Sequence, residues 1–187
     1  TLHKGLYATD ASVYRRIPAA VAYPRTTKGI QQLIAFASQN QTSLIPRTAG
    51  TSLAGQCVGE GIVVDVSRYF TGILSVDKKN KTVTVQPGVI RDELNDYLAP
   101  FGLFFGPNTS TSNRCMIGGM VGNNSSGTTS IQYGVTRDKV LSMQCVLSDG
   151  SDAYFSDISK EKFEKKKEGS SLEATIYRKL YEELSDP

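Results

Sequence analysis

The stretch Gly106–Gly127, GPNTSTSNRCMIGGMVGNNSSG, places the strongest constraint on what this chain can fold into. It is dense in Gly, Ser, Thr and Asn, yet it also contains the apolar residues Met116, Ile117, Met120 and Val121. A flexible linker has no use for such residues. Glycine allows close approach to the backbone, and small polar side chains supply donors and acceptors. We therefore interpret the stretch as a cradle for a large polar ligand, with an ordinary surface loop as the alternative.

A second loop rich in small residues follows a short predicted strand. Residues 42–45 have the pattern of a strand, and they run directly into Pro46–Gln56, PRTAGTSLAGQ. Consecutive backbone N–H groups at a strand end can form a concave nest for a diphosphate, although a plain turn explains this loop equally well. The chain lacks the Gly-Lys-Ser/Thr ending of a Walker loop and the Gly-x-Gly-x-x-Gly spacing of a Rossmann loop.

The two loops together favour a dinucleotide ligand. Twelve of the 17 glycines lie between Pro46 and Gly127, so most of the backbone freedom of the chain is concentrated there. Two phosphate-sized cradles on a small α+β chain suggest a dinucleotide lying between two lobes. Its rings need apolar slots, and Val135, Val140 and Val146 are candidates for one of them. Simple packing in the core of a strand explains each valine at least as well.

Apolar periodicity predicts the other elements. Strands are expected at 20–23, 42–45, 62–66, 73–76, 82–86, 140–147 and 153–156, with hairpins formed by 73–76 with 82–86 and by 140–147 with 153–156. Helices are expected after Thr27 as N-cap (Ile30, Leu33, Ile34, Ala37), over Ile90, Leu94, Tyr97 and Leu98, and over Leu172, Ile176, Leu180 and Leu184. The charged run 160–168 predicts a solvated helix face, and residues 1–20 predict an irregular leader.

Composition excludes several functional classes. The 187 residues are 39% hydrophobic and carry a net charge of +3 spread among acids, which does not indicate nucleic-acid binding. No apolar run approaches the ~20 residues of a membrane span. Three widely spaced cysteines argue against a disulfide scaffold and a zinc site, and they fit a reducing compartment. The only histidine, His3, lies near the start of the sequence, so neither a Ser-His-Asp hydrolase nor a histidine metal site is expected.

Five motifs occur in an order that resembles a known family. They are AYPRT at 22–26, PRTAGTS at 46–52, VQPGV at 85–89, GGMVGNNSSG at 118–127 and YG at 133–134. Together they resemble the PCMH-type FAD-binding domain of the vanillyl-alcohol oxidase superfamily, nearest to its D-lactate dehydrogenase and glycolate oxidase branch. The resemblance covers residues 19–156.

The resemblance implies a two-lobed α+β domain with FAD between the lobes. Residues 19–68 would form a small, mainly parallel sheet with helices, and residues 69–156 an antiparallel sheet with helices on one side. Residues 1–18 would be a leader, and residues 157–187 a helical segment that leads to a substrate-binding cap domain outside this sequence.

The resemblance also implies which residues hold the cofactor. The first loop would donate backbone N–H groups to the pyrophosphate. The second would hold the ribityl chain, the far side of the pyrophosphate and the edge of the isoalloxazine, and the strand 140–146 would lie by the adenine. The expected FAD-binding residues are Arg47, Thr48, Ala49, Gly50, Thr51, Ser52, Leu53, Pro87, Gly88, Pro107, Thr111, Ser112, Ile117, Gly118, Gly119, Gly122, Asn123, Asn124, Ser125, Ser126, Gly127, Tyr133, Gly134, Val140 and Val146.

Two departures from the family pattern concern flavin attachment. Some relatives link flavin covalently through a histidine where this chain has Thr51, and a hydroxyl cannot make that bond. Cys115 lies near a region where some relatives use a cysteine, but its spacing from Gly118-Gly119 differs, so we interpret it as a small buried thiol. The sequence therefore predicts noncovalent FAD.

The resemblance implies a flavin-dependent oxidoreductase that oxidises a small 2-hydroxy acid such as D-lactate. The family's substrate-binding histidines lie in later segments, so catalytic residues are expected outside this sequence and the isolated chain is not expected to be active. The electron acceptor stays open. A reductase of the peptidoglycan-precursor type, which uses NADPH, and a nucleotide-binding or docking module without chemistry are the alternatives. No nucleic-acid partner, metal or transmembrane segment is expected, and we expect a cytoplasmic protein, with peripheral membrane contact of the parent protein left open.

Overall fold

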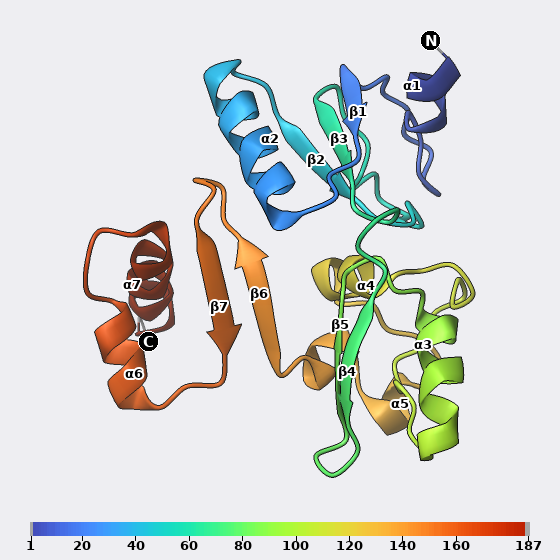
Figure 1. Cartoon of the computed structure of the whole chain (residues 1–187), viewed down its shortest axis with the longest axis vertical. Helices are drawn as coiled ribbons and strands as arrows, with labels where there is room; N and C mark the ends of the chain where they lie inside the picture. The colour runs from blue at the N-terminus through green and yellow to red at the C-terminus, as the bar shows by residue number, and fades with distance from the viewer. Residues whose placement is uncertain (1, 186–187) are drawn as a thin grey trace.

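The computed structural model describes residues 2–185 and shows a mixed arrangement of helices and short strands. In chain order the elements are α1 (Leu2–Leu6), β1 (Ala20–Ala22), α2 (Thr27–Gln39), β2 (Leu44–Arg47), β3 (Ile62–Asp65), β4 (Ile73–Asp77), β5 (Thr82–Val85), α3 (Arg91–Leu98), α4 (Ile117–Asn123), α5 (Ser130–Tyr133), β6 (Ser142–Val146), β7 (Asp152–Ser156), α6 (Lys160–Lys166) and α7 (Leu172–Ser185). Figure 1 shows the first three strands apart from the two later hairpins.

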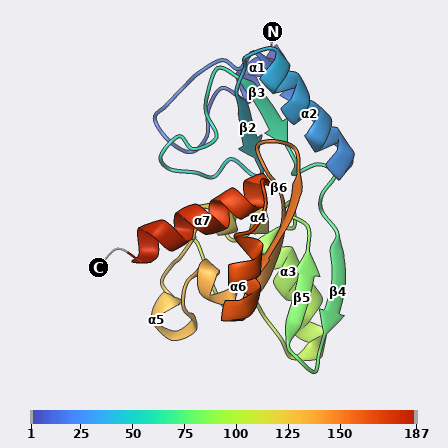
Figure 2. The ribbon, with the colours of Figure 1, turned by 90° about the vertical axis from the view of Figure 1, so that its left-hand side faces the viewer.

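A parallel sheet with the order β1-β3-β2 organises the first part of the chain. All four residues of the central strand β3 are buried, as the apolar run Ile62–Val64 predicts for a strand covered on both faces, and Asp65 at its end is buried with them. Helix α2 packs along the sheet (Figures 1 and 2). Its N-cap is Thr26, whose Oγ1 accepts a hydrogen bond from Gly29 N at 3.1 Å, and not the predicted Thr27. A cap must stand outside the helix with an extended backbone, and Thr26 does so.

Two antiparallel hairpins occupy the second part. The predicted pairing is confirmed in both: β4 pairs with β5, and β6 pairs with β7. They do not join into the single antiparallel sheet that the resemblance implied, because each forms a separate two-stranded unit within residues 2–185. Helix α3 instead packs against the first hairpin through Leu94 and Leu98, which are buried with Val89. Tyr97, predicted on the same face, is 48% exposed.

The C-terminal helices pack on the outer side of β7 (Figure 2). The final helix exists as predicted, but its buried residues are Ala174 and Tyr177. Leu180 and Leu184 of the predicted apolar stripe are exposed, because the helix turns toward the aromatic rings of β7 and α6. Phe155 and Phe163 lie with their ring centres 6.0 and 5.4 Å from that of Tyr177. The predicted charged helix face at α6 is confirmed, since most of its residues are exposed.

The N-terminal segment is more ordered than the sequence predicted. It begins with helix α1, and Ala8 is fully buried. Tyr7 donates a hydrogen bond of 2.6 Å to the buried carboxylate of Asp65 at the end of β3. Burial and this bond raise the pKa of Tyr7, so its hydroxyl keeps the proton that it donates. A tertiary contact across the sheet thus orders a segment that has no strong local pattern. No helix in the described part of the chain is long and apolar enough to cross a membrane.

Candidate functional site

The first polar loop begins at the carboxyl end of β2. Gly50 has a φ of +69°, in the left-handed region that favours glycine. Among residues 2–185, no hydrogen bond satisfies the backbone N–H groups of residues 48–53. Six consecutive backbone donors are therefore available to a ligand at the edge where open parallel sheets bind theirs. Such a row of N–H groups favours an anion.

The second polar stretch contains a helix and is not an open loop throughout. Its centre forms α4, in which Met120 is 2% exposed and provides the apolar anchor expected from the sequence. Gly122 lies three positions after Gly119 and four after Gly118, so the three glycines form one side of the helix. A side chain on Gly122 would meet no atom within 4 Å. We call the open surface at Gly122 the bare face of α4, and a flat or bulky ligand can approach the helix backbone there.

Close packing brings the two polar segments and the turn after β5 together. A methyl group on Gly119 would lie 2.7 Å from Thr48 Oγ1, and one on Gly118 would overlap Pro87. Gly118 N donates to Pro87 O at 2.8 Å. Gln56 Nε2 donates to Asn123 Oδ1 at 3.1 Å, which joins the end of the first loop to the end of α4. We call this meeting point of residues 48–56, 87–89 and 117–123 the junction.

The segment before α4 is held by α3. Ser112 Oγ donates to Asp92 Oδ2 at 2.9 Å, and Arg91 Nε donates to Pro107 O at 3.2 Å. A hydrogen bond from Arg91 to the Asp92 carboxylate, supported by the one from Ser112, lowers the pKa of Asp92. Sequence reasoning missed Arg91 and Asp92. The only available signal was a charged pair at the start of a predicted helix.

Cys115 lies under this segment. It is 4% exposed, and its Sγ is 3.6 Å from Met120 Sδ and 3.2 Å from Thr109 Oγ1. The prediction of a small buried thiol is confirmed.

The residues after α4 mainly fold the chain back on itself. Asn124 ends the helix with a left-handed φ of +47°, and its Oδ1 accepts from Arg137 N at 3.0 Å. Ser125 O accepts from the buried Thr136 hydroxyl at 2.6 Å. Tyr133 packs against Gly106 and, at 5.1 Å between ring centres, against Phe104. These polar groups are therefore engaged within the protein. Thr136 was also missed, because a single threonine carries no sequence signal.

The predicted adenine slot is not gathered at one place. Val140 precedes β6 and Val146 ends it, paired with Asp152. Six residues of extended chain separate the two valines by about 20 Å. One adenine ring cannot contact both of them closely.

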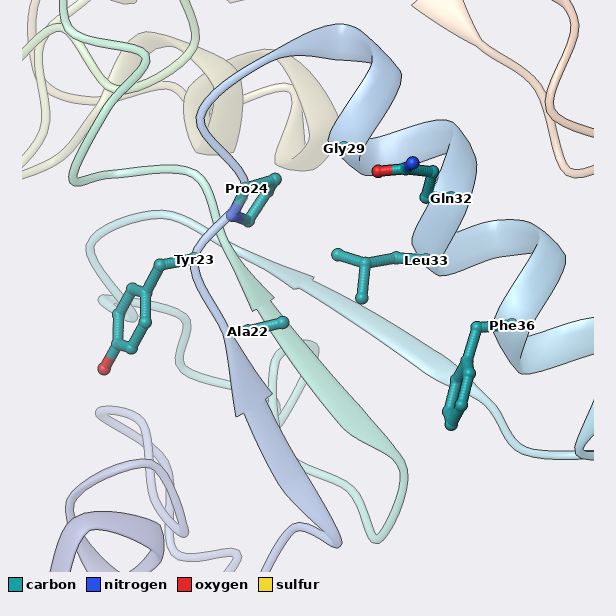
Figure 3. A pocket seen from close by; sticks show the side chains of 7 residues that line it. All are labelled: Ala22, Tyr23, Pro24, Gly29, Gln32, Leu33 and Phe36. Carbon is teal, nitrogen blue, oxygen red and sulfur yellow. The ribbon is translucent and has the colours of Figure 1, made fainter.

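A shallow apolar hollow of about 390 Å³ lies between β1 and α2, away from the junction (Figure 3). Leu33 of α2 points toward Ala22 of β1, whereas the ring of Tyr23 points away from the helix. The Tyr23 hydroxyl instead forms a hydrogen bond of 2.7 Å with Nε2 of His3, which joins the only histidine, in α1, to the residue after β1. Within residues 2–185, no group of three or more His, Cys, Asp or Glu side chains could hold a metal ion.

Comparison with known proteins gives a consistent result. Residues 18–152 match the family described as "FAD binding domain". The chain is 43% identical over 146 residues to D-2-hydroxyglutarate dehydrogenase of Haemophilus influenzae, covering 76% of this chain but 14% of that protein. It is 37% identical over 147 residues to glycolate oxidase subunit GlcD of Bacillus subtilis, covering 78% of this chain and 31% of that protein. This chain therefore spans only a small part of these relatives.

Solved structures share the fold. The 6-hydroxy-D-nicotine oxidase of Arthrobacter nicotinovorans superposes with a TM-score of 0.71 at 21% identity, over 87% of this chain and 36% of that one. A variant of the Physcomitrella patens protein BBE-like 1 gives the same TM-score at 23% identity, over 83% of this chain and 34% of that one. The predicted family resemblance and fold class are confirmed.

Proposed function

This chain belongs to the FAD binding domain family, and from that premise we propose that its junction holds the cofactor. The six free backbone N–H groups of residues 48–53 would bind the pyrophosphate, and this is the observation that carries the proposal. The bare face of α4 would lie against the remainder of the cofactor. In this assignment the residues after Asn123 and the segment 107–112 support the cradle, while one end of β6 lies near the adenine.

The residues present fit FAD in both chemistry and shape. A diphosphate needs convergent N–H donors and no lysine, and the first loop offers such donors at the end of a parallel strand. The flavin and ribityl groups need a surface without protruding side chains, which the open position at Gly122 provides, while Gly118 and Gly119 let α4 pack closely against Pro87 and Thr48. If the chain is divided into the lobes 19–68 and 69–156, the junction contains residues of both lobes.

We propose that FAD is held noncovalently. Thr51 lies in the first loop where a histidine would be needed for a covalent bond. The thiol of Cys115 is buried beside Met120 and is not presented to the junction. Cys57 is also buried, and its Sγ lies 3.7 Å from Asp10 Oδ2.

The parent protein is proposed to be a dehydrogenase of a small 2-hydroxy acid. This rests on relatives named for D-2-hydroxyglutarate, glycolate and D-lactate. When bound, FAD supplies a two-electron acceptor for the hydrogen on the hydroxyl-bearing carbon. The residues of this chain bind and orient the cofactor, and a base that takes the hydroxyl proton is proposed to lie outside them. The sole histidine is engaged with Tyr23 beside α1, which supports that assignment.

Gly122→Leu provides a sharp test of the site. The position is helical and open, so leucine should keep or raise the stability of the ligand-free protein by up to about 1 kcal/mol. The same side chain would occupy the space assigned to FAD. Titration of flavin fluorescence should therefore show tight FAD binding by the wild type and binding at least about tenfold weaker by the variant, about 1.4 kcal/mol.

Gly5→Leu is the matched control, because Gly5 lies in α1 and is also open to solvent. It should bind FAD as the wild type does. Wild-type affinity in a folded Gly122→Leu protein would contradict the assigned face of α4, and a folded wild type that binds no flavin would contradict the function itself.

A further inference from the structure

Residues 2–16 pack against the first loop, although the family match begins only at residue 18. From here on, the word leader means this segment, residues 2–16. Figure 1 shows it running down beside the connection between β2 and β3. The leader closes on itself, since Arg16 N donates to Ala8 O at 2.9 Å and Thr9 forms a β-bridge with Arg15. After helix α1, the leader is therefore a loop held closed by its own hydrogen bonds.

Arg47 links the leader to the most constrained residue of the first loop. Its Nη1 donates to Thr9 O at 2.8 Å, and its Cζ lies 5.2 Å from the centre of the Tyr7 ring. A methyl group on Gly50 would fall against the same guanidinium. Arg47 was predicted to bind the cofactor, but the structure engages its side chain between the leader and the loop. The Arg47 guanidinium therefore lies directly beside Gly50.

Asp10 makes a second link. Its carboxylate accepts hydrogen bonds from Ser12 N at 2.8 Å and from Cys57 Sγ at 3.7 Å, directly after the first loop. Burial opposes the charge on Asp10, yet the hydrogen bonds from Ser12 and Cys57 lower its pKa. The carboxylate is therefore ionised at neutral pH and ties the leader to the end of the first loop.

Tyr14 makes a third link, and Tyr7 fastens the leader to the sheet. A methyl group on Gly55, at the far end of the loop, would lie 2.8 Å from Tyr14 Cδ2. At the other end of the leader, Tyr7 donates to Asp65 at 2.6 Å and accepts from Tyr23 at 2.9 Å. The leader thus contacts both ends of the first loop from a fixed point on the sheet.

We propose that the leader is a positioning element that holds the first loop in its binding shape. The backbone N–H groups of residues 48–53 donate no hydrogen bonds within the described residues. The loop therefore needs contacts with other segments to keep these donors in place for a ligand. If the leader supplies that order during folding, the ligand does not have to supply it on binding. The inference rests on the proposed function, since it identifies what prepares the pyrophosphate site.

The test compares Tyr14→Ala and Asp10→Ala with the wild type in the ligand-free protein. The first readout is the ¹⁵N order parameters of Gly50, Thr51 and Ser52, which should fall from the rigid range near about 0.85 to below about 0.6 in both variants. The second is FAD affinity, which should weaken about tenfold. The thermal midpoint should change little for Tyr14→Ala, because the Tyr14 side chain is largely exposed.

Tyr154→Ala is the matched control. Tyr154 on β7 is 56% exposed, and Tyr14 is 58% exposed. Tyr154 belongs to the second hairpin and not to the leader, so its removal should leave the order parameters and the FAD affinity unchanged. Tyr14→Phe keeps the ring against Gly55 and should retain the wild-type loop, which a general loss of stability would not explain.

Each result decides the inference. Unchanged order parameters in both variants, or a loosened loop with unchanged FAD affinity, would overturn it. If Asp10→Ala does not fold, Tyr14→Ala decides alone. Failure of the wild type to bind FAD would count against the proposed function, whereas the order parameters still decide whether the leader holds the loop.

Discussion

Gly119 and Thr48 are 71 positions apart in the sequence and pack so closely that a single added methyl group on Gly119 would lie 2.7 Å from Thr48 Oγ1. This contact joins the bare face of α4 to the first residue of the loop with free N–H groups. It brings the two polar stretches of the sequence into one site.

Gly118→Ala should destabilise the fold even without flavin. The new methyl group would overlap Pro87 Cβ and lie 3.0 Å from its Cα, and this rigid turn cannot move aside cheaply. Overpacking of this kind costs about 1–3 kcal/mol. Urea unfolding should show that loss. Gly122→Ala is the matched control on the same helix, where open space predicts a gain of up to about 1 kcal/mol; equal stabilities of the two variants would contradict the packing.

Gly50→Val should abolish FAD binding while the rest of the chain stays folded. Its φ of +69° disfavours any side chain by about 1–2 kcal/mol, and the added atoms would push the Arg47 guanidinium. Gly150→Val controls for backbone strain, because Gly150 has a φ of +84° but lies in the open turn of the second hairpin. Isothermal titration with FAD should separate the two, and comparable affinities would remove the special role of Gly50.

Asp92→Asn should change the acid limb of the stability curve. The hydrogen bond from Arg91 lowers the pKa of Asp92 in the folded state, so the unfolded chain binds the proton more readily. The stabilisation is therefore complete above the ordinary Asp pKa of about 3.9 and is lost as the pH falls through the lower folded value. Because the side chain is 39% exposed, screening limits the effect to below about 1 kcal/mol.

The measurement is urea unfolding between pH 2 and pH 7, a range set by that Asp pKa of about 3.9. Asp92→Asn should be less stable than the wild type at neutral pH, and the difference should shrink toward the acid end. Asp96→Asn on the same helix is the control, because Asp96 has no ion-pair or hydrogen-bond partner within residues 2–185. A difference that grows on acidification would show that the sign is wrong.

Acid precipitation of the flavin-loaded protein should leave the yellow colour in the supernatant. Thr51 cannot form a covalent flavin bond, and the Cys115 thiol is buried. Flavin that stays in the washed pellet would show a covalent link. Cys115→Ser would then show whether this thiol carries it.

The local part of the fold could be predicted closely. The strand in Ile62–Asp65, both hairpin pairings and the final helix depend on neighbours along the chain. Apolar period, turn residues and glycine content report such features directly. The family resemblance followed from the order of five motifs, and the match over residues 18–152 confirms it.

Errors occurred where a distant contact determines the outcome. The face by which α7 packs, Ala174 and Tyr177, was not predicted, because the aromatic rings of β7 and α6 fix how that helix turns. The antiparallel part became two separate hairpins.

The sequence by itself determined that this chain has two glycine-rich polar stretches, a buried central strand and the motifs of an FAD binding domain. Only the tertiary structure decided that Thr48 meets Gly119, that Arg47 turns toward Thr9, and that the leader supports the first loop. The physical reason is range. Backbone preference and hydrophobic period depend on residues that are close in the sequence. These contacts join segments that are far apart in the sequence, so no local pattern predicts them.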